Sequence, residues 1–378
     1  MGRAGHTGRR ALALTAAAAV VAAAAAVVIG IGVTGKTEAH EGMVTGTVWV
    51  ANEDDDSVTV IDAATNQVLT TISGVAGPHN VQVSPDDQSV WAVSGHESLA
   101  VQVGSLDLDL QAVVPTGDHP AHVIVAPDGH TAYVTNAGDD TVTAIDVATS
   151  WPIATIPVGA YPHGLRPSPD GRWVYVANMQ DGTVSVIDTT SNTRVADIDV
   201  GATPVQIAFS PDGRYAYASL NADDAVARID VQAQSVIDTV AVGDGPVQLY
   251  ASPDGSVLLV ANEGTAEQPG ATVSIIDIET FAVTSTVETG QGPHGVVIDS
   301  SGRHAYVTNT YGNDVAVIDI VEHAVVARIP VGAKPNGVSY SAAAPPLRLP
   351  ATVELSLGDS GGDHHDDDHH DGDRDHDH

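Results

Sequence analysis

Histidine is the residue type whose positions in this chain suggest chemistry. The 378 residues include 17 histidines and no cysteine, so a transition-metal site would have to use imidazole and carboxylate ligands rather than thiolates. Mixed ligands of this kind suit zinc, copper or nickel, and one segment near the C-terminal end of the sequence is rich in both. Its candidate metal ligands are His364, His365, His369, His370, His376 and His378.

The composition of this segment excludes a packed core. Residues 358–378 consist of Asp, His and Gly with one serine and one arginine, and they include no apolar side chain. We therefore expect a disordered tail at 358–378, reached through a linker at 342–357. Its role is either the capture of divalent metal or the solubility that an acidic tail provides.

A second set of histidines lies within two residues after a proline or in the loop that follows a second strand. Imidazoles that converge could bind a divalent metal or act as acid–base groups near neutral pH. The alternative is structural, with each histidine hydrogen-bonded to a neighbouring repeat. The set comprises His79, His163 and His294, each directly after a proline, together with His122 and His96.

Two further side chains are candidates for ligand binding. Arg166 lies in an expected strand where the other repeats have uncharged residues, so it could fix an anionic group or pair with an internal carboxylate. Asn336 follows a proline, at the position that His79 holds in its own repeat. The loop at 263–272 holds five additional residues. We expect it on the face of the molecule that carries the proline-led loops, where it either shapes a pocket or has no role in one.

The elements that must position these side chains repeat along the chain. Each unit contains a proline-led strand, a turn such as the Ser-Pro-Asp-Gly at 168–171, an aromatic-led strand, a third strand ending in Ile-Asp, and a fourth strand. Four strands at a fixed period predict the blades of a β-propeller. The residues that open the second strand are spaced by 42 residues five times and then by 47: Trp49, Trp91, Tyr133, Tyr175, Tyr217, Leu259 and Tyr306.

The second strands also carry a family motif. Residues 133–136 and 306–309 read Tyr-Val-Thr-Asn, and the other units carry variants of it. On these residues the chain resembles the YVTN family of β-propeller proteins over 46–341. The resemblance implies an all-β, seven-bladed propeller with four-stranded antiparallel blades. It does not select a function, because the family spans surface-layer proteins, lactonases, oxidoreductase subunits and binding proteins.

Two structural details follow from the repeat. We expect the C-terminal inner strand around Val338 to pair with the N-terminal strands of the first blade, beside Trp49, because this closure hides the edges of an open ring. We also expect the carboxylates that end the third strands to cap turns: Asp62, Asp146, Asp188, Asp230, Asp277 and Asp319.

Charge and the N-terminal segment bear on location and partners. Three arginines precede the uncharged stretch 11–33, which is typical of an export signal at 1–39 that is cleaved near Ala39 or kept as a membrane anchor. We expect an exported monomer, secreted or on the cell surface, that touches a membrane only through this segment if it is kept. The net charge of −34 disfavours nucleic acid as a partner.

Two short sequence patterns match known functional motifs, but the residues around them do not support either function. Residues 30–37 match a phosphate-binding loop, but the export segment precedes them in place of a buried strand. Residues 358–362 match the segment around the nucleophile of chymotrypsin-like proteases, but no base to activate the serine is recognisable.

Three functions are compatible with these features. The sequence offers no complete set of nucleophile, base and orienting residue. This favours a non-enzymatic protein that binds a protein or small molecule on the face that carries the proline-led loops. The sequence establishes no cofactor, and it is compatible with a divalent transition metal: zinc, copper or nickel. The alternatives are a lactonase-like or metal-dependent oxidoreductase-like enzyme with a histidine-lined site, and a structural module of the cell surface.

Overall fold

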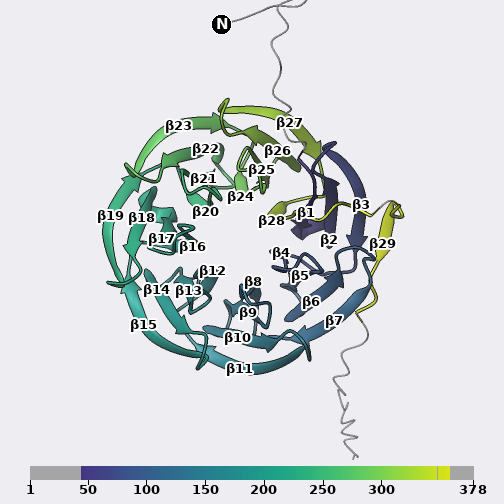
Figure 1. Ribbon diagram of the computed structural model, residues 1–378, viewed down its shortest axis with the longest axis horizontal. Coiled ribbons are helices and arrows are strands. Elements are labelled where there is room, and N and C mark those ends of the chain that lie inside the picture. The colour runs from purple at the N-terminus through teal and green to yellow at the C-terminus, as the bar shows by residue number, and fades with distance from the viewer. Residues whose placement is uncertain (1–43, 347, 358–378) are drawn as a thin grey trace, which may run out of the picture. The chain divides into compact units, whose positions relative to one another are not determined.

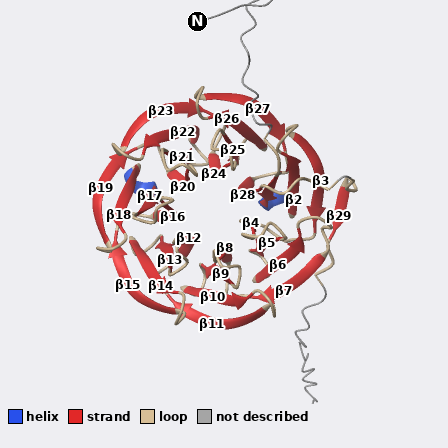
Figure 2. Ribbon diagram, viewed as in Figure 1, coloured by secondary structure: helices blue, strands red, loops and turns tan. Residues whose placement is uncertain are grey.

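The predicted architecture is confirmed by the computed structural model, which describes residues 44–346 and 348–357. Seven sheets surround a common axis (Figure 1), and six of them are four-stranded and antiparallel throughout. Strands dominate the ring (Figure 2), and the described helices are the 3-10 turns η1 (Glu53–Asp55) and η2 (Asn221–Asp223). None of the described helices is long and apolar enough to cross a membrane. The expected export segment and tail lie outside the described residues.

Four strands of each blade run from the axis to the rim. The innermost strands are β28 (Pro335–Ser341), β4 (Val81–Val83), β8 (Pro120–Val125), β12 (Pro162–Pro167), β16 (Pro204–Phe209), β20 (Pro246–Ala251) and β24 (Pro293–Ile298). The second strands are β1 (Thr47–Asn52), β5 (Ser89–Ser94), β9 (Thr131–Asn136), β13 (Trp173–Asn178), β17 (Tyr215–Leu220), β21 (Val257–Gly264) and β25 (His304–Asn309).

The outer half of each blade holds the remaining strands. The third strands are β2 (Ser57–Asp62), β6 (Leu99–Gly104), β10 (Thr141–Asp146), β14 (Thr183–Asp188), β18 (Ala225–Asp230), β22 (Pro269–Asp277) and β26 (Asp314–Asp319). The rim strands are β3 (Gln67–Ser73), β7 (Leu110–Pro115), β11 (Trp151–Pro157), β15 (Thr193–Asp199), β19 (Ser235–Ala241), β23 (Ala282–Glu288) and β27 (Ala324–Pro330).

The repeated motif supplies the core and ties strands together. Its opening aromatic residues are at most 1% exposed, from Trp49 in the first blade to Tyr306 in the seventh, so each fills the space between two blades. Its closing asparagine bridges two strands. Asn136 Nδ2, for example, donates to the hydroxyls of Thr141 and Thr143 at 2.9 Å each. The motif therefore specifies the packing and the strand pairing of the blade.

The ring closes as expected. β28 pairs antiparallel with β1, which places Val338 opposite Val50 and Ser339 opposite Trp49. The first blade is thus completed by the last inner strand, and both lie side by side in Figure 1.

The segment 342–357 differs from the linker that we expected. Within it, β29 (Thr352–Glu354) pairs in parallel with β3 and adds a fifth strand to the outer edge of the first blade. Leu355 follows this strand and is 8% exposed, packed in the core between the first and second blades. An exposed rim strand offers unpaired backbone groups, and here the chain itself occupies them.

The antiparallel order gives the ring two distinct faces. The loops that enter the innermost strands and those that follow the second strands emerge on one face, which we call the loop face. The turns between first and second strands, and between third and fourth strands, emerge on the other, which we call the turn face. On the turn face the expected capping is confirmed, since Asp188 Oδ1 accepts backbone N–H bonds from Thr190 and Ser191 at 2.9 and 3.0 Å.

Candidate functional site

Four of the five predicted ring histidines meet on the loop face beside the axis. The centroid of the His79 ring lies 5.5 Å from that of His122, 5.1 Å from that of His163 and 5.7 Å from that of His294. The His122 and His163 rings are 4.7 Å apart. These side chains come from four different blades, on the loop before β4 and on β8, β12 and β24. Ring closure therefore brings together residues that are up to 215 positions apart in the sequence, from 79 to 294.

Three of the histidines form a group with metal-binding geometry. His79, His122 and His163 each offer one nitrogen, and these atoms lie within 4.8 Å of one another. The Nε2 atoms of His79 and His163 are 3.1 Å apart. Two imidazole nitrogens bound to one tetrahedral zinc ion at 2.0–2.1 Å would lie about 3.4 Å apart. The pair is thus already close to the spacing that one ion would impose.

The environment keeps two of these rings neutral. Burial, followed by repulsion from His79 and His294, lowers the pKa of His163 to about 3. Burial and the neighbouring histidines also hold the pKa of His122 well below its usual value. A neutral imidazole has the free lone pair that a metal ion requires, so both rings stay available as ligands well below neutral pH.

A carboxylate outside the cluster orients His79. Glu53, in η1 directly after β1, accepts a hydrogen bond from His79 Nδ1 at 3.2 Å, which leaves the lone pair on Nε2. Lys334 Nζ lies 2.7 Å from Glu53 Oε1, and Asn336 Nδ2 donates to Glu53 Oε2. Burial alone would raise the pKa of Glu53, but bonding to His79 and Lys334 outweighs it and lowers this pKa to about 2. Glu53 is therefore a fixed anion behind the imidazole.

The same arrangement occurs a second time. His294 Nδ1 lies 3.2 Å from Glu263 Oε1, at ion-pair distance although the N–H direction is poor for a hydrogen bond. Burial opposes the ionised form of Glu263, but the interactions with His294, His79 and Lys334 together outweigh burial and lower the pKa of Glu263 below its usual value. Glu263 belongs to the hairpin that the five additional residues lengthen, between β21 and β22. The position of Glu263, directly after Asn262, exists in every repeat, so the five additional residues do not supply this carboxylate.

Sequence reasoning missed Glu53, Glu263 and Lys334. A signal was present for the two glutamates, because each directly follows the asparagine that ends a second strand. In the other blades this position holds Gly95, Ala137, Met179, Asn221 or Thr310. Each glutamate also precedes a blade that begins with Pro-His, so a carboxylate and an imidazole meet across two successive blades.

His96 lies apart from the three-histidine group, over a neighbouring cavity. This cavity has a volume of about 260 Å³ and is lined by His79, His163 and Glu53 together with His96, His119 and Tyr161. The His96 ring lies over Gly77, which adopts a φ of 55° and could not carry a side chain there without a clash. The histidine cluster therefore borders a space that can admit a small molecule.

The two candidate ligand-binding residues have different surroundings. Asn336 is 2% exposed, and its amide is engaged by Glu53, with Nδ2 also 3.1 Å from His79 Nδ1. Arg166 lies on β12, three residues beyond His163. Among the described residues no carboxylate lies at ion-pair distance from its guanidinium, so the internal ion pair that we considered is not formed.

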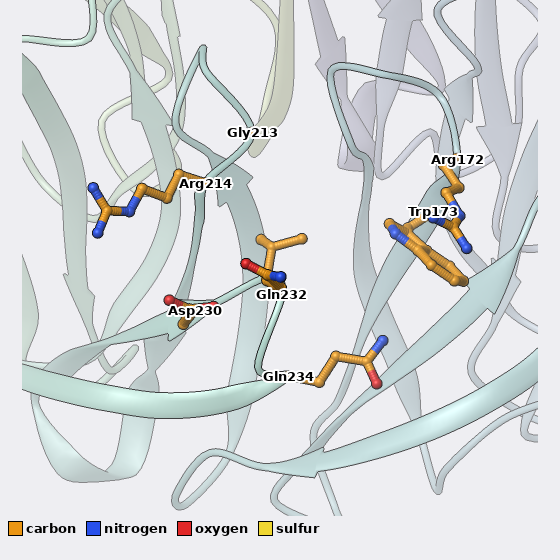
Figure 3. A pocket seen from close by; sticks show the side chains of 8 residues that line it. Arg172, Trp173, Gly213, Arg214, Asp230, Gln232 and Gln234 are labelled. Carbon is orange, nitrogen blue, oxygen red and sulfur yellow. The ribbon is translucent and has the colours of Figure 1, made fainter.

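A larger hollow lies on the turn face, away from the histidines. It has a volume of about 440 Å³ between the fourth and fifth blades and is lined by Arg172, Trp173, Arg214 and Asp230, among others (Figure 3). Arg172 packs over the Trp173 ring with its Cζ atom 4.4 Å from the ring centroid. No set of convergent unpaired groups accompanies these exposed arginines, which stack on aromatic rings as solvated surface cations do.

Comparison with known proteins places the chain among propellers. A family model described as YNCE-like beta-propeller matches residues 11–297 and 265–346. No curated protein matches the sequence. Similar structures include the hydrazine synthase of Kuenenia stuttgartiensis, at 23% identity and a TM-score of 0.63, covering 71% of this chain and 90% of that one.

Two further solved structures share the ring. A functionally unknown protein from Desulfotomaculum acetoxidans is 17% identical with a TM-score of 0.70, covering 80% of this chain and all of that one. The dihydro-heme d1 dehydrogenase NirN is 18% identical with a TM-score of 0.60, covering 78% of this chain and 74% of that one. At these identities the likeness extends to the fold alone.

Proposed function

Because the chain belongs to the YNCE-like β-propeller family, a fold that serves several purposes, we propose from its site that it binds one divalent transition-metal ion on the loop face. His79, His122 and His163 are the ligands, and His294 lies beside them as a fourth. The observation that carries this proposal is the approach of three imidazole nitrogens to within 4.8 Å of one another.

Unpaired nitrogens in the cluster support an ion. His122 Nε2 is buried without a hydrogen-bond partner, and so is Nε2 of His294. Buried polar atoms are nearly always paired, so two unpaired nitrogens in one cluster support a missing binding partner. The donor set, imidazoles without thiolates, suits zinc, copper or nickel.

The outer contacts support the same interpretation. Glu53 orients His79. His163 Nδ1 lies 3.2 Å from the carbonyl oxygen of Val205, which accepts its N–H and leaves the lone pair of Nε2 to bind the ion. Metal-binding histidines in proteins commonly donate their second N–H to a carboxylate or a backbone carbonyl in this way.

We propose that the ring acts outside the cytoplasm as a binding protein rather than as an enzyme. The residues of the tail at 358–378, with their six histidines, would gather the same metal loosely and supply it to the ring site. The leader at 1–39 is the sequence feature that supports export.

A second candidate function is metal-dependent hydrolysis of the lactonase kind. It is favoured by the cavity of about 260 Å³ against His79 and His163, because three protein ligands leave an open position for a water or a substrate. Turnover of simple lactones by the metal-loaded protein, absent after chelation, would favour this candidate over the binding protein.

Metal analysis of the purified protein tests the main proposal. The full chain and a chain ending at residue 357 are each loaded with zinc, desalted and assayed for bound metal. We expect one ion per ring to remain in the shorter chain, and none in that chain after His79→Ala with His163→Ala. A shorter chain that retains no zinc, copper or nickel would contradict the proposal.

A further inference from the structure

Arg166 is unusual among the cations of this acidic ring. Of the eight Lys and Arg residues between 44 and 346, five pair with a carboxylate: Arg194, Arg228, Arg303, Arg328 and Lys334. Two of the other three, Arg172 and Arg214, are exposed on the turn face and solvated. Arg166 is half-buried, and its one described contact is with an aromatic ring.

The guanidinium of Arg166 projects toward the axis. Its Cζ atom lies 5.7 Å from the ring centroid of Tyr250 on β20, beyond the intervening strand β16. On the other side it acts on His122 of β8, where its charge helps to lower the pKa of that ring. A side chain that approaches both β8 and β20 from β12 must lie inside the ring of innermost strands.

Within residues 44–346 and 348–357, no carboxylate lies at ion-pair distance from Arg166. Burial lowers the pKa of Arg166, because protein replaces much of the water around its charge. Desolvating a cation without a partner is costly, so such a group in a folded protein indicates an anion that the described residues do not provide.

A second unpaired donor lies on β20, the strand that carries Tyr250. Gln248 on β20 is 5% exposed and its Nε2 atom is buried without a partner. The equivalent residue of the preceding blade, Gln206, has its Nε2 atom 3.4 Å from His122 Nδ1, two blades away, which is possible only across the inside of the ring. By the repeat, Gln248 faces inward as well, two residues before Tyr250 and thus on the same side of its strand.

We propose that Arg166 and Gln248 form a binding site for a small carboxylate at the propeller axis. The planar guanidinium would hold the carboxylate by two parallel hydrogen bonds, and the amide would donate a third. His163 lies three residues away on the same strand, roughly 10 Å along it, so a short organic acid bound to Arg166 can extend to the histidine cluster. This last feature rests on the proposed metal site, whereas the carboxylate site itself does not.

The test measures binding of acetate, succinate and sulfate to the metal-free full chain by NMR saturation transfer and calorimetry. We expect acetate and succinate to bind at one site with millimolar affinity, and to bind at least tenfold more weakly in Arg166→Gln. Arg166→Lys should weaken binding less, because it keeps the charge and loses the paired geometry. Arg172→Gln, which removes an exposed arginine from the turn face, is the matched control and should bind like the wild type.

The outcomes separate this site from the metal site. His79→Ala with His163→Ala should lose metal and keep acetate binding, while Arg166→Gln should lose acetate binding and keep metal. Arg166→Gln should also unfold at the same temperature as the wild type or a higher one. Two results would overturn the proposal. One is an equal acetate affinity in the wild type and Arg166→Gln, and the other is a wild-type protein that binds sulfate but neither acetate nor succinate.

Discussion

The two faces of the ring are built from the same repeat, but their polar side chains have different partners. On the turn face the Ser-Pro-Asp-Gly turns and the Ile-Asp caps form their hydrogen bonds within one blade. Ser210 Oγ donates to Asp212 Oδ1 at 2.6 Å, and Asp230 Oδ1 accepts the backbone N–H of Ala233 at 2.8 Å, all within a few residues. In the histidine cluster of the loop face the side chains contact residues of other blades, as His79 does with His163, or leave a nitrogen without a partner, as His122 Nε2 does.

The difference teaches where to look for function in a repeat protein. Residues that satisfy one another locally are explained by the folding of their own blade. Residues that meet only after ring closure and still leave nitrogens unpaired need a further partner. The larger hollow of about 440 Å³ on the turn face is lined by none of the clustered histidines, whereas the smaller cavity of about 260 Å³ on the loop face is lined by His79, His163 and Glu53.

The largest expected effect is the loss of zinc affinity when the proposed metal-binding histidines of the loop face are removed. His79→Ala with His163→Ala should weaken zinc binding to a chain ending at residue 357 by more than about 100-fold, beyond the cost of a lost outer contact. Calorimetric titration with zinc measures it. The control is His130→Ala, which removes an exposed histidine from the turn face and should leave the affinity unchanged. Equal losses in both variants would erase the distinction between the faces.

A smaller effect is expected from the carboxylate behind the cluster. Glu53→Gln keeps the shape but removes the charge that orients His79, so zinc affinity should fall by about 10–100-fold. Glu279→Gln, which alters a carboxylate of a turn-face hollow, serves as the matched control. If the zinc affinity of Glu53→Gln equals that of Glu279→Gln, Glu53 has only a structural role.

The pH dependence of stability sharpens the comparison further. In the metal-free protein His163 has a pKa of about 3, below its ordinary value of 6.5, so between these values the unfolded chain binds a proton that the folded chain does not. Stability should therefore fall as the pH drops from about 6.5 toward 3. His163→Asn should flatten this slope in calorimetric scans between pH 7 and 4. His130→Asn is expected to keep the wild-type slope, and a slope unaffected by His163→Asn would refute the assignment.

The smallest effect should come from the turn face. Asp188→Ala removes the cap that accepts the N–H groups of Thr190 and Ser191, and it should cost about 1 kcal/mol of unfolding free energy in urea. Zinc affinity should stay the same, because the bonds close within one blade. A change in zinc affinity would show that the faces are coupled.

Much of this molecule follows from local sequence. The spacing of Trp49, Trp91 and Tyr133 determines the blade, the Ser-Pro-Asp-Gly turns and the Ile-Asp caps are specified by neighbouring residues, and the ring closure follows from the two ends of the repeat. The histidines after proline were recognisable as candidates for the same reason. The packing of Thr352–Glu354 against β3 was not, because a three-residue strand depends on an edge that another part of the chain supplies.

The sequence by itself determined the seven-bladed ring and the face on which polar loops gather, because a repeated pattern of short strands and turns encodes its geometry locally. Only the tertiary structure decided that His79, His122, His163 and His294 meet, that Glu53 and Glu263 lie behind two of them, and that Arg166 is left without a carboxylate. These relations join blades that are distant in the sequence. Distances across the axis arise from the rotation between blades, and no local pattern of residues records it.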